Sequence, residues 1–204
     1  MLNSHSNAIT HAMGMIKQFY VLFANGYDPA KNPQLGRTTE AFMRAVMTED
    51  VVCAEFKGVE LFLSQYLLSS QTHASFKLAL HDINVINSEN DGIIQIKATA
   101  TCIFRIKRET LESLFPPIIE DEELTQELIG KEYVLQYDKV FHFQRGVVFQ
   151  HESRVDLCNG ILEMVQDPFV AMKLLKASVM TKHGHLKVDH RIEEDAHLLE
   201  NSVL

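Results

Sequence analysis

Several ionisable side chains fall within one short part of the sequence: Asp138, His142 and His151. Alternating apolar and polar residues predict two antiparallel strands here, EYVLQYDKVFHF and VVFQHESRVDLC, joined at a turn of Arg145 and Gly146. Such a turn pairs Gln144 with Val147, His142 with Phe149, Val140 with His151, and Asp138 with Ser153. In that register Asp138 and His151 are diagonal neighbours, so a carboxylate and an imidazole can meet across the hairpin.

A carboxylate beside an imidazole is suited to general acid–base chemistry. In an enzyme, Asp138 would orient His151, which would exchange a proton with a bound carbonyl compound, and Tyr20 would donate to the oxyanion. The alternative is a buried histidine whose hydrogen bonds are satisfied by an aspartate, without any reaction. The residues by themselves leave both alternatives open.

The same register gives the two faces of the hairpin different roles. One face would line a pocket, together with small residues of an earlier strand: His142, Val140, Phe149, Ala98 and Ala100. The small residues indicate either a helix lying close or the floor of a cavity. The other face carries an apolar row that we expect to form a homodimer interface on the outside of the sheet: Tyr133, Leu135, Tyr137, Phe141 and Phe143. Alternatively, a C-terminal helix from Phe169 to Met180 covers this row within one chain.

Further elements must support this hairpin. Apolar residues at helical spacing predict a helix over residues 8–23, and Thr38 or Thr39 can begin a second, short helix. A short strand over 51–56, a helix over 59–70 and a hairpin with strands at 74–87 and 92–107 follow. Residues 108–131 form an acidic insertion that Pro116 and Pro117 break into two short helices. This insertion is either a solvated segment or a lid over a pocket mouth, and we expect it to be mobile.

Composition argues against several classes of protein. The chain has 204 residues, a formal net charge of −8 and no local cluster of lysines and arginines, so we expect no direct binding to nucleic acid. The sequence shows neither a membrane-spanning stretch nor a signal-peptide pattern, which predicts no membrane partner and a cytoplasmic or nuclear location. Cysteines without CxxC spacing predict no metal site. His183 and His185 have no third ligand nearby and are expected to be a solvated pair, and we expect no cofactor. We expect a single domain over residues 8–181, between a flexible start at 1–7 and a loose tail at 182–204.

The order of elements resembles the NTF2-like or SnoaL-like superfamily: over residues 8–160, a helix, a short helix, a short strand, a helix and four long antiparallel strands. Four stretches are similar to the NTF2-like domain that follows the basic zipper in oomycete bZIP proteins: FMRAVM at 42–47, FLSQY at 62–66, ETLESLFP at 109–116 and LIGKE at 128–132. No basic region and no leucine heptads precede residue 8, so a DNA-binding role is not carried over.

The resemblance implies an α+β, cystatin-like fold in which a curved antiparallel sheet wraps around N-terminal helices as a cone, with a C-terminal helix added. It implies first a noncatalytic ligand-binding or dimerisation module with a regulatory role. One alternative is an isomerase, cyclase or dehydratase that uses the Asp138 and His151 pair. Another is a protein-interaction module whose cavity is filled by side chains. The expected partners are a second copy of the chain and a small apolar or carbonyl-bearing ligand.

Overall fold

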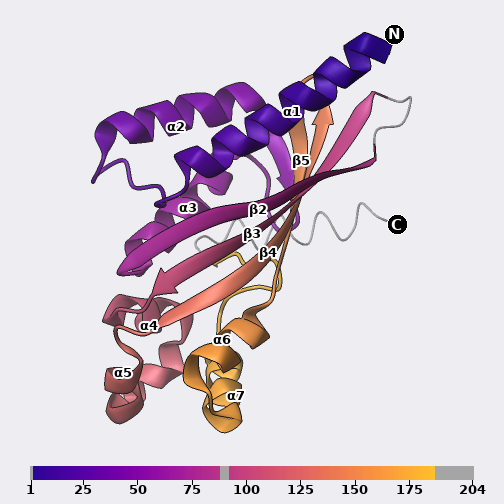
Figure 1. Cartoon of the computed structure of the whole chain (residues 1–204). Coiled ribbons are helices and arrows are strands. Elements are labelled where there is room, and N and C mark those ends of the chain that lie inside the picture. Colours follow the sequence, from indigo (N-terminus) through magenta and orange to yellow (C-terminus); the bar gives the residue numbers. More distant parts are fainter. Residues whose placement is uncertain (1, 88–91, 187–204) are drawn as a thin grey trace.

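The computed structural model describes residues 2–87 and 92–186, with side chains from residue 5 onward. The helices are α1 (Leu2–Leu22), α2 (Pro33–Val46), α3 (Val59–Thr72), α4 (Arg108–Leu114), the 3-10 helix η1 (Pro116–Glu120), α5 (Glu122–Leu128), α6 (Leu157–Val165) and α7 (Pro168–Ala177). The strands are β1 (Met47–Cys53), β2 (Ser75–Asn87), β3 (Ile93–Arg105), β4 (Glu132–Gln144) and β5 (Val147–Val155). Figure 1 shows α1, α2 and α3 on one side of the curved sheet and α4 to α7 gathered towards one end of it. This arrangement confirms the expected α+β class. None of the helices in the described residues is long and apolar enough to cross a membrane.

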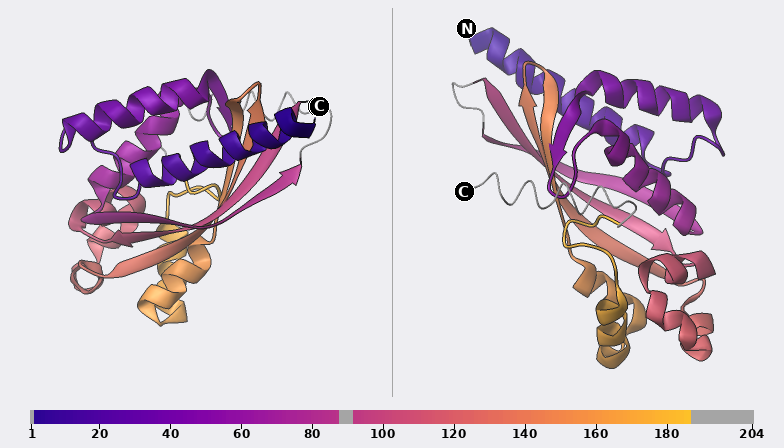
Figure 2. Two further views of the ribbon diagram at one scale, coloured as in Figure 1. Left: turned by 45° about the horizontal axis from the view of Figure 1, so that its top comes forward. Right: turned by 180° about the vertical axis from the view of Figure 1, so that it is seen from behind.

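The five strands form one sheet in the order β1-β5-β4-β3-β2. Strands β2 to β5 are antiparallel to their neighbours, whereas β1 pairs with β5 in parallel, so the sheet is antiparallel only over its four long strands. The views in Figure 2 show the strong twist that lets this sheet curve around the N-terminal helices. A concave face, covered by helices, is the result.

The hairpin of β4 and β5 departs from the predicted register because of a β-bulge. Both loop residues have positive φ, 52° at Arg145 and 83° at Gly146, and Gln144 pairs with Val147 as predicted. Beyond Phe143, however, Phe149 is an extra residue, and the pairs become His142 with Gln150, Phe141 with His151 and Asp138 with Arg154. A shift of one residue exchanges the faces of a strand. The predicted neighbours Asp138 and His151 therefore lie on opposite faces of the sheet.

The apolar row predicted to form a dimer interface faces inward. Tyr133, Leu135, Tyr137, Phe141 and Phe143 are all buried in the core of the single chain. Helix α1 covers part of this row, with the rings of Phe19 and Phe141 5.8 Å apart. The prediction that this row is an outer interface was therefore wrong, because the N-terminal helices pack on the face of β4 that carries these side chains. Helix α7 is not the cover either, since it packs against α6 and η1.

Several boundaries also differ from the sequence predictions. Helix α1 already begins at Leu2, so residues 2–7 are not the loose start that we expected. Helix α2 begins at Pro33, where the side chain of Asn32 accepts a hydrogen bond from the backbone of Leu35, rather than at Thr38 or Thr39. The predicted last strand stops at Val155, and Asp156 caps the unpredicted helix α6 by accepting from Asn159.

The acidic insertion is packed rather than fully solvated. Its two predicted helices are α4 and α5, with η1 at the prolines between them. The apolar side chains along it are buried: Leu111, Leu114, Phe115, Ile118 and Leu128. Backbone hydrogen bonds join Ile106 to both Gly130 and Lys131, so the two ends of the insertion are held together. The insertion lies at the end of the sheet that α6 and α7 also cover (Figure 1).

Candidate functional site

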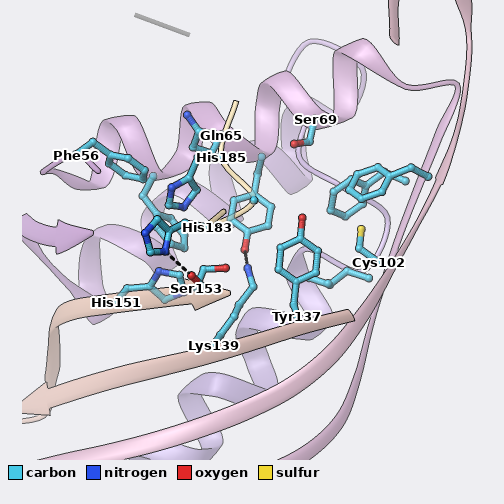
Figure 3. Close-up of a pocket in the computed structure, with 16 residues that line it drawn as sticks. Phe56, Gln65, Ser69, Cys102, Tyr137, Lys139, His151, Ser153, His183 and His185 are labelled. Carbon is cyan, nitrogen blue, oxygen red and sulfur yellow. Dashed lines mark hydrogen bonds between the residues drawn. The ribbon is translucent and has the colours of Figure 1, made fainter. Parts of the chain in front are cut away.

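A small cavity of about 40 Å³ lies inside the cone, between the concave face of the sheet and α3. Its polar lining includes Gln65 and Tyr66 of α3, Tyr137 and Lys139 of β4, and His151 and Ser153 of β5. Figure 3 shows Tyr137 and Lys139 rising from the same strand towards this space, with His151 and Ser153 beside them. Alternation along β4 and β5 places these side chains on one face.

Lys139 is the charged group of this cavity. Its side chain is 6% exposed, and its amine donates a hydrogen bond to the hydroxyl of Tyr66 at 2.5 Å. The amine also lies 5.0 Å from the ring centroid of Tyr66 and 5.1 Å from that of Tyr137, within the range of a cation–π contact. Burial lowers the pKa of Lys139 to about 8. Among the residues that the structure describes, no carboxylate forms an ion pair with it.

Two polar side chains next to Lys139 lack hydrogen bonds. Both ring nitrogens of His151 and the hydroxyl of Ser153 are buried without a partner in the described part of the chain. The ring of His151, 2% exposed, packs edge-on against Phe62 and Phe141. Burial, and then the nearby Lys139 charge, hold the pKa of His151 well below its usual range, so the imidazole is neutral. Buried polar atoms without partners are rare and suggest that something else satisfies them.

The chain after α7 lines one side of the cavity, between α3 and β5. We call residues 181–186 the C-terminal plug. Gln65 holds it through two hydrogen bonds with the backbone of Leu186, at 3.1 and 2.8 Å, and His183 bonds the carbonyl of Ser153 at 2.8 Å. Residues 182–186 of the predicted loose tail are therefore packed, while residues 187–204 lie outside the described part of the chain.

His185 anchors the plug to the loop after β1. Its Nδ1 lies 2.6 Å from Glu55 Oε2, which also accepts from the hydroxyl of Thr181 at 2.8 Å. Burial alone would raise the pKa of Glu55, but these hydrogen bonds outweigh it and lower that pKa, whereas burial lowers the pKa of His185. The predicted solvated pair of His183 and His185 is thus wrong for His185, which is buried.

A groove of about 270 Å³ lies next to the cavity. It runs along β1 and β5, and it shares His151, Ser153 and His183 with the cavity lining. These three residues therefore form the wall between the groove and the cavity.

The comparisons with known proteins agree with this architecture. Residues 13–72 match the family described as the BZIP transcription factor 1 C-terminal domain. AclR, a proposed hydroxylase from Streptomyces galilaeus, has a TM-score of 0.50 and 9% identity, over 95% of this chain and 94% of its own. The order of helices and strands, with the sheet curved around the first helices, decides the fold. The fold is NTF2-like, as the resemblance of the sequence implied.

Two further solved structures are similar to the chain at lower TM-scores. A proposed SnoaL-like polyketide cyclase from Jannaschia sp. CCS1 has a TM-score of 0.48 and 13% identity, over 78% of this chain and 94% of its own. An NTF2-like protein of unknown function from Burkholderia pseudomallei has a TM-score of 0.46 and 13% identity, over 77% of this chain and 98% of its own. No curated protein matches the sequence. At these identities the likeness concerns the fold and not the activity.

The NTF2-like cone separates the residues that we predicted as a catalytic pair. Asp138 lies on the outer face, 47% exposed, where it accepts hydrogen bonds from Lys97 at 2.8 Å and Thr99 at 3.2 Å. His151 lies inside the cone. The proposed orientation of His151 by Asp138 is therefore excluded by the sheet between them.

The other predicted site residues are also divided between the two faces. His142 and Val140 lie on the outer face, where His142 is 2.9 Å from Glu152, and Phe149 is the bulged residue beside them. Ala98 and Ala100 are buried on the inner face, opposite Lys139 and Tyr137, but they do not line the cavity. Tyr20 is buried in α1 with its hydroxyl unpartnered in the described residues, also away from the cavity lining.

Sequence reasoning overlooked Lys139 and the plug. Lys139 interrupts the apolar row of β4, and a single lysine on an otherwise apolar face could have marked it as an inward-facing group. The plug carries no comparable signal, because its residues are polar and its partners are distant in sequence. No group of three His, Cys, Asp or Glu side chains within residues 2–87 and 92–186 could hold a metal ion.

Proposed function

We propose that this NTF2-like chain is a noncatalytic module that binds a small molecule inside the cone, through a carbonyl or carboxylate oxygen at Lys139. The observation that supports it is the buried amine of Lys139 beside the unpartnered polar atoms of His151 and Ser153. Such a group of polar atoms is costly to bury without partners.

The kind of ligand follows from the surplus of donors. A lysine ammonium can donate three hydrogen bonds, a serine hydroxyl one, and a neutral imidazole one. Tyr66 accepts one of the bonds from Lys139. A ligand that brings oxygen acceptors would satisfy the remaining donors, and a cavity of about 40 Å³ suits a group of few atoms.

The lack of a carboxylate in the cavity favours binding over catalysis. No Asp or Glu is among the described residues that line it, so the Asp138 and His151 pair of the enzyme alternative has no counterpart there. The similarity of residues 13–72 to the C-terminal domain of BZIP transcription factor 1 favours a regulatory role. A cytoplasmic or nuclear location remains our prediction.

Thermal unfolding in the presence of acetate tests this proposal. Acetate is a small oxygen acceptor, and binding to the folded state alone raises the melting temperature with concentration. We expect acetate to stabilise the wild-type protein beyond the effect of equal chloride. The matched variants are Lys139→Met, inside the cone, and Lys97→Met, on the outer face of the adjacent strand.

The two variants separate a specific site from a general salt effect. Lys97→Met should keep the response to acetate, and Lys139→Met should lose it. An equal response in all three proteins, or none in the wild type, would overturn the proposal. Native mass spectrometry of the purified protein would in addition reveal a retained small molecule.

A further inference from the structure

We infer that Lys139 is a covalent binding site for small carbonyl compounds, which it holds as an imine. This inference rests on the proposed function and specifies its ligand as an aldehyde or ketone. It is carried by the surroundings of the Lys139 amine, by the polar groups on the cavity wall and by the groove that leads to them.

The surroundings of the amine favour a neutral nitrogen. Lys139 projects from β4 into the core and is only 6% exposed, so its amine is desolvated, and desolvation disfavours the charged form. Its hydrogen-bond partner is the uncharged hydroxyl of Tyr66. By contrast, Lys97 on the neighbouring strand is held by the carboxylate of Asp138 at 2.8 Å. A desolvated lysine without a counter-ion is the usual form of an amine nucleophile in proteins.

The fraction of neutral amine is what makes the reaction feasible. With a pKa of about 8, Lys139 would be uncharged in about one molecule in ten at about pH 7. An ordinary lysine is uncharged in roughly one molecule in 2,500 at that pH. Lys139 therefore has a large advantage as a nucleophile wherever a carbonyl compound can reach it.

The reaction needs no oxidant, reductant or metal. The nitrogen lone pair of neutral Lys139 attacks the carbonyl carbon, and a proton moves from nitrogen to oxygen to give a carbinolamine. The carbon–oxygen bond then breaks, the hydroxyl leaves with one further proton as water, and a carbon–nitrogen double bond remains. The imidazole of His151 and the hydroxyl of Ser153, both unpartnered in the described chain and on the cavity wall, are placed to relay these protons.

The groove along β1 and β5 supplies the route of entry. Its volume of about 270 Å³ admits a small organic molecule, and the side chains that divide it from the cavity are His151, Ser153 and His183. Of these, His183 belongs to the C-terminal plug, so we expect a shift of the plug to widen the passage between groove and cavity. The small volume next to Lys139 limits the ligand to a few heavy atoms unless the plug moves.

Reductive trapping tests the inference directly. The folded protein is incubated at about pH 7 with acetaldehyde and sodium cyanoborohydride, which reduces an imine to a stable ethylamine, and each lysine is quantified by peptide mass spectrometry. We expect Lys139 to be ethylated at least about tenfold faster than Lys97 in the same sample. In urea the difference should disappear, because unfolding removes the environment of Lys139.

The outcomes distinguish this inference from the proposed function. Slower or equal ethylation of Lys139 relative to Lys97 would overturn the inference that Lys139 forms an imine. If acetate still stabilises the wild-type protein in that case, noncovalent binding at Lys139 stands by itself. If neither acetate nor acetaldehyde acts at Lys139, both proposals fail. The Lys97→Met variant should leave trapping at Lys139 unchanged, which excludes an indirect effect of the outer face.

Discussion

At the scale of single residues, Lys139 and His73 are two of the buried ionisable groups in this core. Lys139 lies in a row of aromatic and aliphatic side chains, and His73 lies between α3 and β4 with hydrogen bonds to Tyr133 and Ser69, both of 2.7 Å. Each is kept away from water, and each therefore connects the stability of the fold to pH in a defined direction.

Replacing Lys139 with methionine should stabilise the protein. The variant keeps a similar volume and removes a desolvated charge, so we expect the free energy of unfolding at about pH 7 to rise by roughly 1–3 kcal/mol. The folded pKa of about 8 lies below the unfolded value, so the unfolded chain binds more protons between them. Wild-type stability should therefore increase from about pH 8 to about pH 10, and the variant should lack this increase. Urea unfolding across this range measures both effects, and a variant less stable than wild type at neutral pH would contradict them.

Acid should weaken the fold through His73. Burial lowers its pKa to about 4, which outweighs the opposing hydrogen bond to the Ser69 carbonyl. Below about pH 6.5 the unfolded chain binds a proton that folded His73 does not, so stability falls until about pH 4, by roughly 3 kcal/mol. His73→Gln should reduce this slope in urea titrations. His81→Gln, at an exposed position of β2, should keep the wild-type slope; equal slopes in all three proteins would refute this role of His73.

At the scale of elements, the bulge in β5 and the C-terminal plug together build the site. The bulge turns His151 and Ser153 inward, and the plug closes the space above them. Gly184 allows the plug to approach so closely: its φ is +77°, and an added Cβ would lie 2.7 Å from the Tyr137 ring. Only a residue without a side chain fits there without displacement of the ring.

Gly184→Ala should therefore loosen the plug. We expect a loss of roughly 1–2 kcal/mol in stability, and faster hydrogen exchange at the Leu186 amide, which donates to Gln65. Gly130→Ala is the matched control, since its φ is +88° but nothing lies within 4 Å of an added Cβ. Gly130→Ala should lose stability through backbone strain, but hydrogen exchange at the Leu186 amide should stay as in the wild type. Unchanged exchange at Leu186 in Gly184→Ala would mean that the plug does not depend on this contact.

At the scale of the whole molecule, the homodimer remains a prediction, but its interface must be a different surface from the aromatic row that we predicted. Because the aromatic row of β4 is inside the cone, a dimer through the sheet must use the outer face, where Val140 and Phe149 are half-buried beside His142. Val140→Asp should weaken such a dimer, whereas Val85→Asp on the edge strand β2 should not. Native mass spectrometry of the wild-type protein and of both variants distinguishes monomers from dimers. A wild-type monomer, or a dimer that Val140→Asp leaves intact, would contradict the prediction.

The sequence by itself determined the class of fold and the positions of most elements. Helical spacing of apolar residues and strand alternation are local properties, so α3, the two hairpins and the start of α7 at Pro168 could be predicted from short windows. The resemblance of residues 42–66 and 109–132 to an NTF2-like domain added the cone. Only the tertiary structure decided which faces of the hairpin are inside. The N-terminal helices pack on the face of β4 that carries Phe141, and a bulge at Phe149, which has no signature in the alternation, brings His151 of β5 to that same face. The C-terminal plug could likewise not be predicted from the sequence, since its hydrogen bond to Gln65 joins residues 121 positions apart. The site at Lys139 depends on both of these long-range features, and so no short window of the sequence could predict it.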